Sequence, residues 1–274
     1  MLRSEPHNQT VRNRVALPDE VSALSSRPGV PAQAPKVVTF HGGKGGVGTS
    51  MLASELACVL ARSGQLTVAI DADLERGALH YRMDVPVGSA TFSMADVFPV
   101  WQDLSGDLLR NAATASPHGP HLMPSPVRRF AGPVPDAAVA SSLVSALRAA
   151  FDRSVIDTRA SMDEFTGGLL AASDLVVLVV TPELASLGSA KRALCSMDSL
   201  PGGRPEVSLL VNRSMGQHDV AAVRDIESYL GLRAAACLPE ETVVCRRIGN
   251  ECRPLSNERC ALGRAVLQFA GTLI

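Results

Sequence analysis

Aromatic residues are scarce in this 274-residue chain, at 4% of the sequence, with a single tryptophan. An excess of charge is also lacking: the formal net charge is −1 at pH 7, which predicts no overall attraction to nucleic acid or anionic lipid. No apolar run reaches the length of a membrane-spanning helix, and the first residues lack the apolar core of a signal peptide. We therefore expect a cytoplasmic protein without a membrane segment of its own.

Cysteine pairs with the spacing of a metal site are absent as well. The six cysteines form no C-x-x-C pair, and the last four, from Cys237 to Cys260, have no histidine among them. A zinc site is therefore disfavoured, and reduced thiols in a cytosolic protein are expected.

Short apolar runs alternate with helical patterns along most of the chain. The apolar runs lie at 37–40, 66–70, 155–156, 175–180, 207–211 and 234–238. The helical patterns lie at 50–63, 136–150, 184–200, 219–230 and 258–273. Near-continuous apolar strands separated by helices are typical of a parallel sheet buried on both faces. The sequence thus predicts an α/β fold with a mostly parallel central sheet and helices on both faces.

Two regions depart from this alternation. Residues 1–35 are rich in proline, serine, arginine and asparagine and have no sustained period, so we expect a flexible N-terminal tail. Residues 36–274 are expected to form one domain. Within it, 77–135 is proline-rich and irregular, which predicts a variable lobe with a short helix near 94–100 and a strand near Leu122.

A glycine-dense loop joins the first strand to the first helix, in the stretch VVTFHGGKGGVGTS from Val37 to Ser50. Strand, glycine loop and helix form the setting of a phosphate-binding P-loop, in which backbone N–H groups and the helix N-terminus face the phosphates. Against the pattern G-x-x-x-x-G-K-[ST], the chain has Thr49 in place of the lysine, followed by Ser50 as the hydroxyl that ligates Mg²⁺. The alternative is a glycine-rich turn without a ligand. The residues predicted to contact nucleotide here are Gly43, Lys44, Gly45, Gly46, Val47, Gly48, Thr49 and Ser50.

Polar residues follow the predicted strands where each one ends, which is the edge at which parallel sheets bind ligands. They are Asp71, Asp73, Asp157, Arg159, Asn212, Arg213 and Pro239. The alternative interpretation of Asp71 and Asp73 is a pair of solvated loop residues. The alternative interpretation of Pro239 is a turn without a ligand. Arg159 has two equal alternatives, a phosphate contact or an ion pair with an acid.

The sequence K-G-G-V-G with its early Lys44 resembles the deviant-Walker-A ATPases, the ParA/MinD group of P-loop NTPases. The resemblance implies a nucleotide-binding domain over 36–274 that takes ATP and Mg²⁺. It implies that Asp71 and Asp157 lie at the metal with Ser50, and that Asp73 orients or deprotonates the attacking water. It also implies that Asn212, Arg213 and Pro239 contact the base. In this group the early lysine reaches the partner's nucleotide across a sandwich homodimer, which gives Lys44 a catalytic role.

Within that group, G-G-V-G followed by Thr-Ser resembles the CpaE/TadZ branch, whose members act in Tad (Flp) pilus assembly. The segments Asp73–Gly77 (DLERG) and Leu122–Pro126 (LMPSP) are similar to segments of that branch. The resemblance implies a localisation or assembly factor that pilus or secretion proteins recruit to the inner membrane or a cell pole. CpaE-type proteins often carry a receiver-like domain ahead of the ATPase, and 1–35 is too short for one.

Two other functions remain open. A partition or septum-positioning ATPase would need a basic DNA-binding surface or a basic C-terminal helix. Here the residues after Arg264 have no lysine or arginine, and glutamates interleave with the late arginines, so DNA binding is disfavoured. A metabolic P-loop enzyme is disfavoured because 77–135 shows no catalytic constellation.

The absence of the P-loop lysine predicts weak nucleotide binding and slow hydrolysis. Losing a charge-assisted contact to phosphate costs roughly 1.5–3 kcal/mol of binding. We therefore expect weak ATP–Mg²⁺ binding by the monomer, dimerisation around the nucleotide with Lys44 supplying charge, and slow or absent hydrolysis. A loop that is only a relic of the fold, in a pseudo-ATPase, is the alternative.

Overall fold

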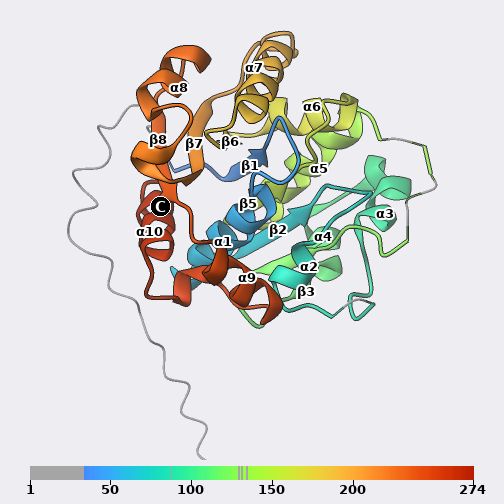
Figure 1. The fold of residues 1–274 in the computed structure, drawn as a ribbon. Helices are drawn as coiled ribbons and strands as arrows, with labels where there is room; N and C mark the ends of the chain where they lie inside the picture. Colours follow the sequence, from blue (N-terminus) through green and yellow to red (C-terminus); the bar gives the residue numbers. More distant parts are fainter. Residues whose placement is uncertain (1–33, 87, 129, 131, 134) are drawn as a thin grey trace, which may run out of the picture.

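A computed structural model describes residues 34–86, 88–128, 130, 132–133 and 135–274 (Figure 1). The predicted tail at 1–35 lies outside the described residues, except for its last two. The rest is built on an eight-stranded sheet with the order β3-β4-β2-β5-β1-β6-β7-β8. Every neighbouring pair is parallel except β3 with β4, which confirms the predicted α/β fold with a mostly parallel sheet.

The strands, in chain order, are β1 (Val37–His41), β2 (Thr67–Asp71), β3 (Thr114–Ala115), β4 (His121–Met123), β5 (Arg153–Asp157), β6 (Leu175–Val180), β7 (Val207–Ser214) and β8 (Ala234–Pro239). The α-helices are α1 (Thr49–Arg62), α2 (Leu79–Arg82), α3 (Met94–Val97), α4 (Gly106–Ala112), α5 (Ala137–Ala150), α6 (Glu164–Ala172), α7 (Leu184–Asp198), α8 (Val223–Leu230), α9 (Thr242–Asn250) and α10 (Ala261–Gly271). Short 3₁₀ helices lie at η2 (Phe98–Asp103), η3 (Gly216–His218) and η4 (Leu255–Asn257).

Helices cover both faces of the sheet because successive strand side chains point to opposite sides. In β6, Leu175, Val177 and Val179 pack toward α1 and α10, whereas the alternate residues pack toward α7 and α8. Helices α4, α5 and α6 continue the second layer over β2 and β5. Figure 1 shows α6, α7 and α8 on one side of the sheet and α1, α9 and α10 on the other.

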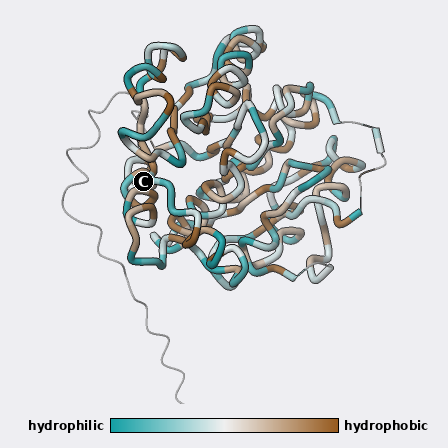
Figure 2. Tube along the Cα trace, in the orientation of Figure 1, coloured by the Kyte–Doolittle hydropathy of each residue, from teal (hydrophilic) through white to brown (hydrophobic). Residues whose placement is uncertain are grey.

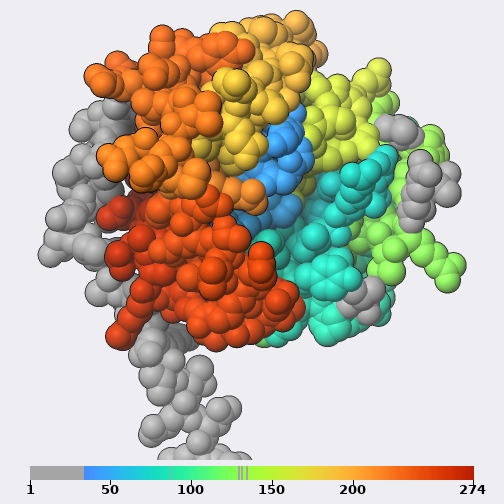
Figure 3. Space-filling model, viewed as in Figure 1, coloured from blue at the N-terminus to red at the C-terminus, as the bar shows by residue number. Residues whose placement is uncertain are grey.

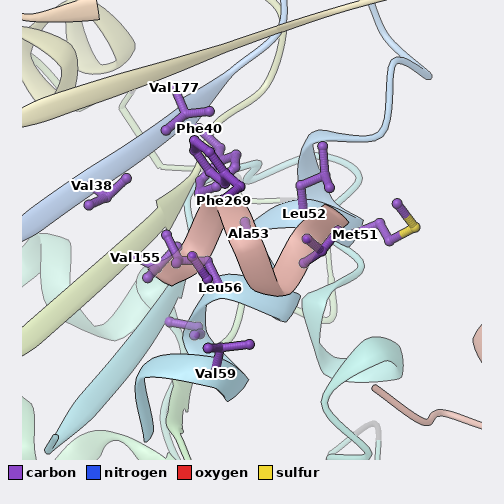
Figure 4. Close-up of a cluster of buried hydrophobic side chains, with 14 of the residues drawn as sticks. Val38, Phe40, Met51, Leu52, Ala53, Leu56, Val59, Val155, Val177 and Phe269 are labelled. Atoms are coloured by element: carbon purple, nitrogen blue, oxygen red, sulfur yellow. The ribbon is translucent and has the colours of Figure 1, made fainter. Parts of the chain in front are cut away.

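The core on the α1 side holds the first helix in place. Phe40 of β1, Leu56 of α1 and Phe269 of α10 point toward one another (Figure 4), and each is at most 5% exposed. Hydrophobic residues gather where helices meet the sheet, and the outer turns are mostly hydrophilic (Figure 2). Because α1 starts directly after the glycine loop, this packing positions the loop.

Two predicted elements differ in detail. The helix predicted over 219–230 begins only at Val223, because the Asp219 carboxylate accepts hydrogen bonds from the Ser214 hydroxyl and the Met215 N–H and holds a turn instead. The irregular lobe contains the predicted strand at Leu122 and a helix at Met94–Val97, and also two helices that were not predicted, α2 and α4.

Candidate functional site

Two glycines of the loop between β1 and α1, Gly48 and Gly43, are required for different reasons. Gly48 precedes α1 with φ +103°, a left-handed conformation that side chains rarely adopt. Gly43 lies against the backbone of α7, and a Cβ there would come within 2.5 Å of the Ser189 carbonyl group. Both constraints give the loop a conformation that other residues would not keep.

Asn212 holds the same loop from the end of β7. Its Nδ2 donates a hydrogen bond to the Val47 carbonyl oxygen at 2.8 Å, and the side chain is buried. Asn212 was predicted to contact the base, and the structure places its amide nitrogen against the loop backbone. The order of the sheet explains this contact, because β7 lies two strands from β1 on the side of α7.

Asp71 and Asp157 end adjacent strands, β2 and β5, and are paired in the parallel register. Both carboxyl groups are buried. Asp71 accepts hydrogen bonds from the Leu79 N–H at 3.0 Å and the Asp73 N–H at 3.3 Å. Asp157 Oδ1 is buried without a hydrogen-bond partner among the described residues. Two acids predicted from separate stretches of sequence are thus side by side at the base of the loop.

Burial controls the protonation of this pair. It raises the pKa of Asp71 to about 7, and it raises the pKa of Asp157 well above its usual range, with the neighbouring Asp71 adding to the shift. The Ser50 hydroxyl lies close enough to the Asp157 carboxyl to oppose that shift. An oxygen that lacks a partner, beside a second carboxylate and a hydroxyl, fits a hard divalent cation such as Mg²⁺, which would compensate the buried charge.

The Asp73 carboxyl group forms hydrogen bonds within its own loop. Its Oδ1 accepts hydrogen bonds from the N–H groups of Glu75 at 3.2 Å and Arg76 at 3.0 Å. This fixes the carboxyl group just past β2, next to Asp71. Its role in orienting or deprotonating the attacking water stays a prediction.

Two of the predicted cations, Lys44 and Arg159, are paired with acids. Lys44 Nζ donates to Glu183 Oε2 at 2.9 Å, in an exposed ion pair at the rim. Arg159 pairs with Asp163 and with Glu75, the latter at 2.9 Å. Of the two alternatives stated for Arg159, the structure shows the ion pair with acids.

A cavity of about 260 Å³ adjoins the loop on the side of β7 and β8. It brings Arg213 and Pro239, both predicted to contact the base, together with Gly48. Sequence reasoning missed another residue of this cavity, Arg82, because α2 is a single turn that carries no periodic signal.

His41 is a buried residue that sequence reasoning also missed. The Thr158 hydroxyl donates to the Phe40 carbonyl oxygen at 2.8 Å, so it accepts from His41 Nδ1–H at 3.0 Å. Burial lowers the pKa of His41 to about 4. His41 is therefore a neutral imidazole that joins the ends of β1 and β5 beneath the loop.

Comparison with known families shows the family to which this chain belongs. Residues 35–200, more than half of the chain, match the model of the AAA domain family. The chain belongs to the AAA domain family. Among curated relatives, the septum site-determining protein MinD of Helicobacter pylori is 28% identical over 217 residues, covering 75% of this chain and 78% of that protein. A putative MinD of Oltmannsiellopsis viridis is 26% identical over 249 residues, covering 84% and 73%.

Solved structures show that this AAA domain has the fold of the ParA/MinD P-loop ATPases. A ParA family ATPase from Chlorobium tepidum TLS superposes with a TM-score of 0.77 at 22% identity, covering 86% of this chain and 98% of that one. MinD from Pyrococcus horikoshii OT3, solved with Mg-ADP, superposes with a TM-score of 0.71 at 18% identity, covering 86% and 94%. The predicted fold is confirmed. Over the described residues, no helix combines the length and apolar character needed to cross a membrane.

Proposed function

We propose that this chain binds ATP and Mg²⁺ at the glycine loop and forms a nucleotide-sandwich homodimer that hydrolyses ATP slowly or not at all. Gly43 to Thr49 would hold the phosphates, while Ser50, Asp71 and Asp157 would hold the metal. Mg²⁺ would neutralise charge on the phosphates. Asp73 would position a water for attack.

The observation that carries the proposal is the buried Oδ1 of Asp157, which has no hydrogen-bond partner in the described part of the chain. A buried carboxylate oxygen without a partner is costly, and the cost is removed when a cation binds. The oxygen lies at the base of a glycine loop whose shape Gly43, Gly48 and Asn212 maintain. The relative from Pyrococcus horikoshii, whose solved structure contains Mg-ADP, supports the same assignment.

Exposed apolar side chains support the dimer. Leu184, Met215 and Val243 are each more than half exposed, and they follow the ends of β6, β7 and β8. This is the edge of the sheet where the loop and Lys44 lie. A second copy placed on this edge would cover these side chains and bring its own Lys44 to the nucleotide.

At the cellular level, we propose a role in localisation or assembly of a Tad (Flp) pilus, as a cytoplasmic protein recruited to the inner membrane or a cell pole by pilus or secretion proteins. The Thr49-Ser50 pair after the last loop glycine, the DLERG segment and the β4 segment support this branch. Partition or septum positioning is the second candidate, favoured by the MinD relatives.

Two structural features weigh against DNA tracking or membrane insertion in that second candidate. Arg247 and Arg253 form ion pairs with Glu258, and Arg253 also pairs with Glu251. The apolar face of α10, including Leu262 and Phe269, is buried in the core.

The metal site is tested by calorimetry of ADP binding with Mg²⁺ and with EDTA. We expect the unmodified chain to bind more tightly with Mg²⁺ by about tenfold or more, and Asp157→Asn to lose that dependence, since the amide cannot replace a charged ligand. Asp198→Asn, an exposed acid paired with Arg204, is the control and should behave as the unmodified chain. No uptake of ATP or ADP at high protein concentration would contradict the proposed function.

The cellular role is tested by deleting the gene in the source organism. Loss of pili with normal division supports the pilus assignment. Misplaced septa or loss of plasmids with normal pili would replace it with the second candidate.

A further inference from the structure

Arg82 lines the cavity of about 260 Å³ beside the glycine loop. It belongs to α2, a helix that no sequence motif identified. Helix α2 contacts α1, and Arg82 lines the cavity together with Gly48 and Met51, residues of the loop and the first turn of α1. Figure 1 shows α2 beside α1 and α9, and in Figure 3 the teal surface of this region adjoins the red surface of the C-terminal helices. The cavity thus has a cation on the side opposite β7 and β8.

No described acceptor holds the Arg82 guanidinium. Over the described residues, Arg82 forms neither a hydrogen bond nor an ion pair, whereas Lys44 and Arg159 are both paired with acids. Arg213, the other cation of the cavity, is likewise unpaired within the described part of the chain and has a left-handed backbone, with φ +58°. Strained backbone of this kind is retained where a site requires it.

The acids in the same cavity do not neutralise these arginines directly. Glu240 accepts a hydrogen bond from the Thr242 hydroxyl at 2.8 Å, and Glu241 accepts one from the Ala261 N–H at 3.2 Å. Neither glutamate lies within ion-pair distance of Arg82 or Arg213 in the described structure. The two guanidinium groups therefore remain available to an anion.

The charge of Arg82 also acts on the proposed metal site. It is the basic side chain whose charge lowers the pKa of Asp157, against the burial that raises it. Arg82 therefore lines the cavity beside Gly48 and carries a charge that acts at Asp157. In a nucleotide bound between that cavity and the proposed metal site, the phosphates would lie between the base and the metal.

We propose that Arg82 binds the phosphates of the nucleotide from within the same chain and supplies the positive charge that Thr49 lacks. The ligand class is a nucleoside di- or triphosphate, and this inference rests on the proposed function. Arginine suits the role because its planar guanidinium donates two parallel hydrogen bonds to phosphate oxygens. A charge supplied in cis allows a single chain to take nucleotide before its partner arrives.

The test measures ADP–Mg²⁺ binding by calorimetry in Arg82→Met, which keeps the aliphatic stem, and Arg82→Lys, which keeps the charge. We expect Arg82→Met to weaken binding by about tenfold or more, with Arg82→Lys recovering part of the loss. The matched control is Arg76→Met. Arg76 lies on the same stretch after β2 and is also unpaired in the described structure, but it borders a different cavity.

Two further arms separate a phosphate contact in cis from other roles. Repeating the comparison in a Lys44→Ala background should give the same fold loss, because Arg82 acts without the partner's lysine. The loss should be larger for ADP than for adenosine; an equal loss for both would place Arg82 at the base and overturn the inference. Urea unfolding without nucleotide should be unchanged in Arg82→Met and Arg82→Lys, so that a loss of binding is not a loss of folding.

The outcomes distinguish the two levels of the proposal. If the unmodified chain binds ADP and Arg82→Met binds as Arg76→Met does, the inference on Arg82 is wrong and the proposed function stands. If the unmodified chain takes up no nucleotide, both are overturned.

Discussion

Lys44 Nζ lies 2.9 Å from Glu183 Oε2, so the lysine expected to reach a partner's nucleotide is paired within its own chain. The pair is exposed, with 42% and 56% of the two side chains accessible, and such pairs contribute only about 0.2–1 kcal/mol. Glu183 therefore holds the lysine at the rim with little cost to releasing it.

Releasing Lys44 should favour the dimer. In Glu183→Gln the pair is lost, so we expect nucleotide-dependent dimerisation to tighten by roughly two- to fivefold. Sedimentation equilibrium with a non-hydrolysable ATP analogue measures this change. Glu206→Gln, at the opposite end of the sheet, is the control, and weaker dimerisation in Glu183→Gln would contradict the assigned role of the pair.

Gly43→Ala should destabilise the folded chain. Its Cβ would meet the Ser189 carbonyl group at 2.5 Å, so α7 or the loop must shift, at a cost of about 1–3 kcal/mol. Urea unfolding measures the loss. Gly45→Ala is a matched control, because a Cβ at Gly45 has nothing within 4 Å and its φ is not positive. Equal stability of the two variants would show that the contact with α7 is not needed.

Glu55→Ala should also reduce stability, through the C-terminal segment. The buried Glu55 carboxylate on α1 accepts hydrogen bonds from the Leu255 N–H at 2.6 Å and the Ser256 N–H at 3.0 Å. Alanine would leave both donors without their partner, and each costs about 1–3 kcal/mol when buried. Glu251→Ala removes only an exposed ion pair with Arg253 and should cost less than about 1 kcal/mol. Denaturant unfolding compares the two, and similar losses would contradict the prediction.

Asp71 should make stability fall as pH rises. Its pKa is 3.8 when unfolded and about 7 in the fold, so between these values the folded chain keeps a proton that the unfolded chain releases. The free energy of unfolding therefore decreases as pH rises through that window, by about 1.4 kcal/mol for each unit of pKa difference. Asp157 acts in the same direction, since its pKa is raised too.

His41 acts in the opposite direction, because its pKa falls from 6.5 to about 4 and the unfolded chain binds the extra proton. The Asp71 contribution is therefore isolated by comparison with Asp71→Asn. We expect the free energy of unfolding of the unmodified chain to fall relative to that of Asp71→Asn as the pH rises from 3.8 to about 7, measured by urea unfolding at each pH. A difference that is independent of pH would contradict the buried, protonated state of Asp71.

The elements that could be predicted from sequence are those whose apolar pattern is continuous. The run Leu175–Val180 is β6 without a change of boundary, because both faces of that strand are buried. Helix α6 was missed because Gly167 and Gly168 interrupt it, and Gly168 is needed where α6 packs closely on Ala137 and Ala140. Helix α9 was missed because it is short, at nine residues, and only Ile248 of its apolar side chains is fully buried.

The linear sequence alone determined the glycine loop, the acids at the strand ends and the parallel sheet, because each depends on residue types within a few positions of one another. Only the tertiary structure decided that Asp71 and Asp157 lie side by side, that Asn212 holds the loop, that Arg159 is paired with acids, and that Arg82 enters the cavity. Those contacts join residues far apart in the chain, and strand order and helix packing set them.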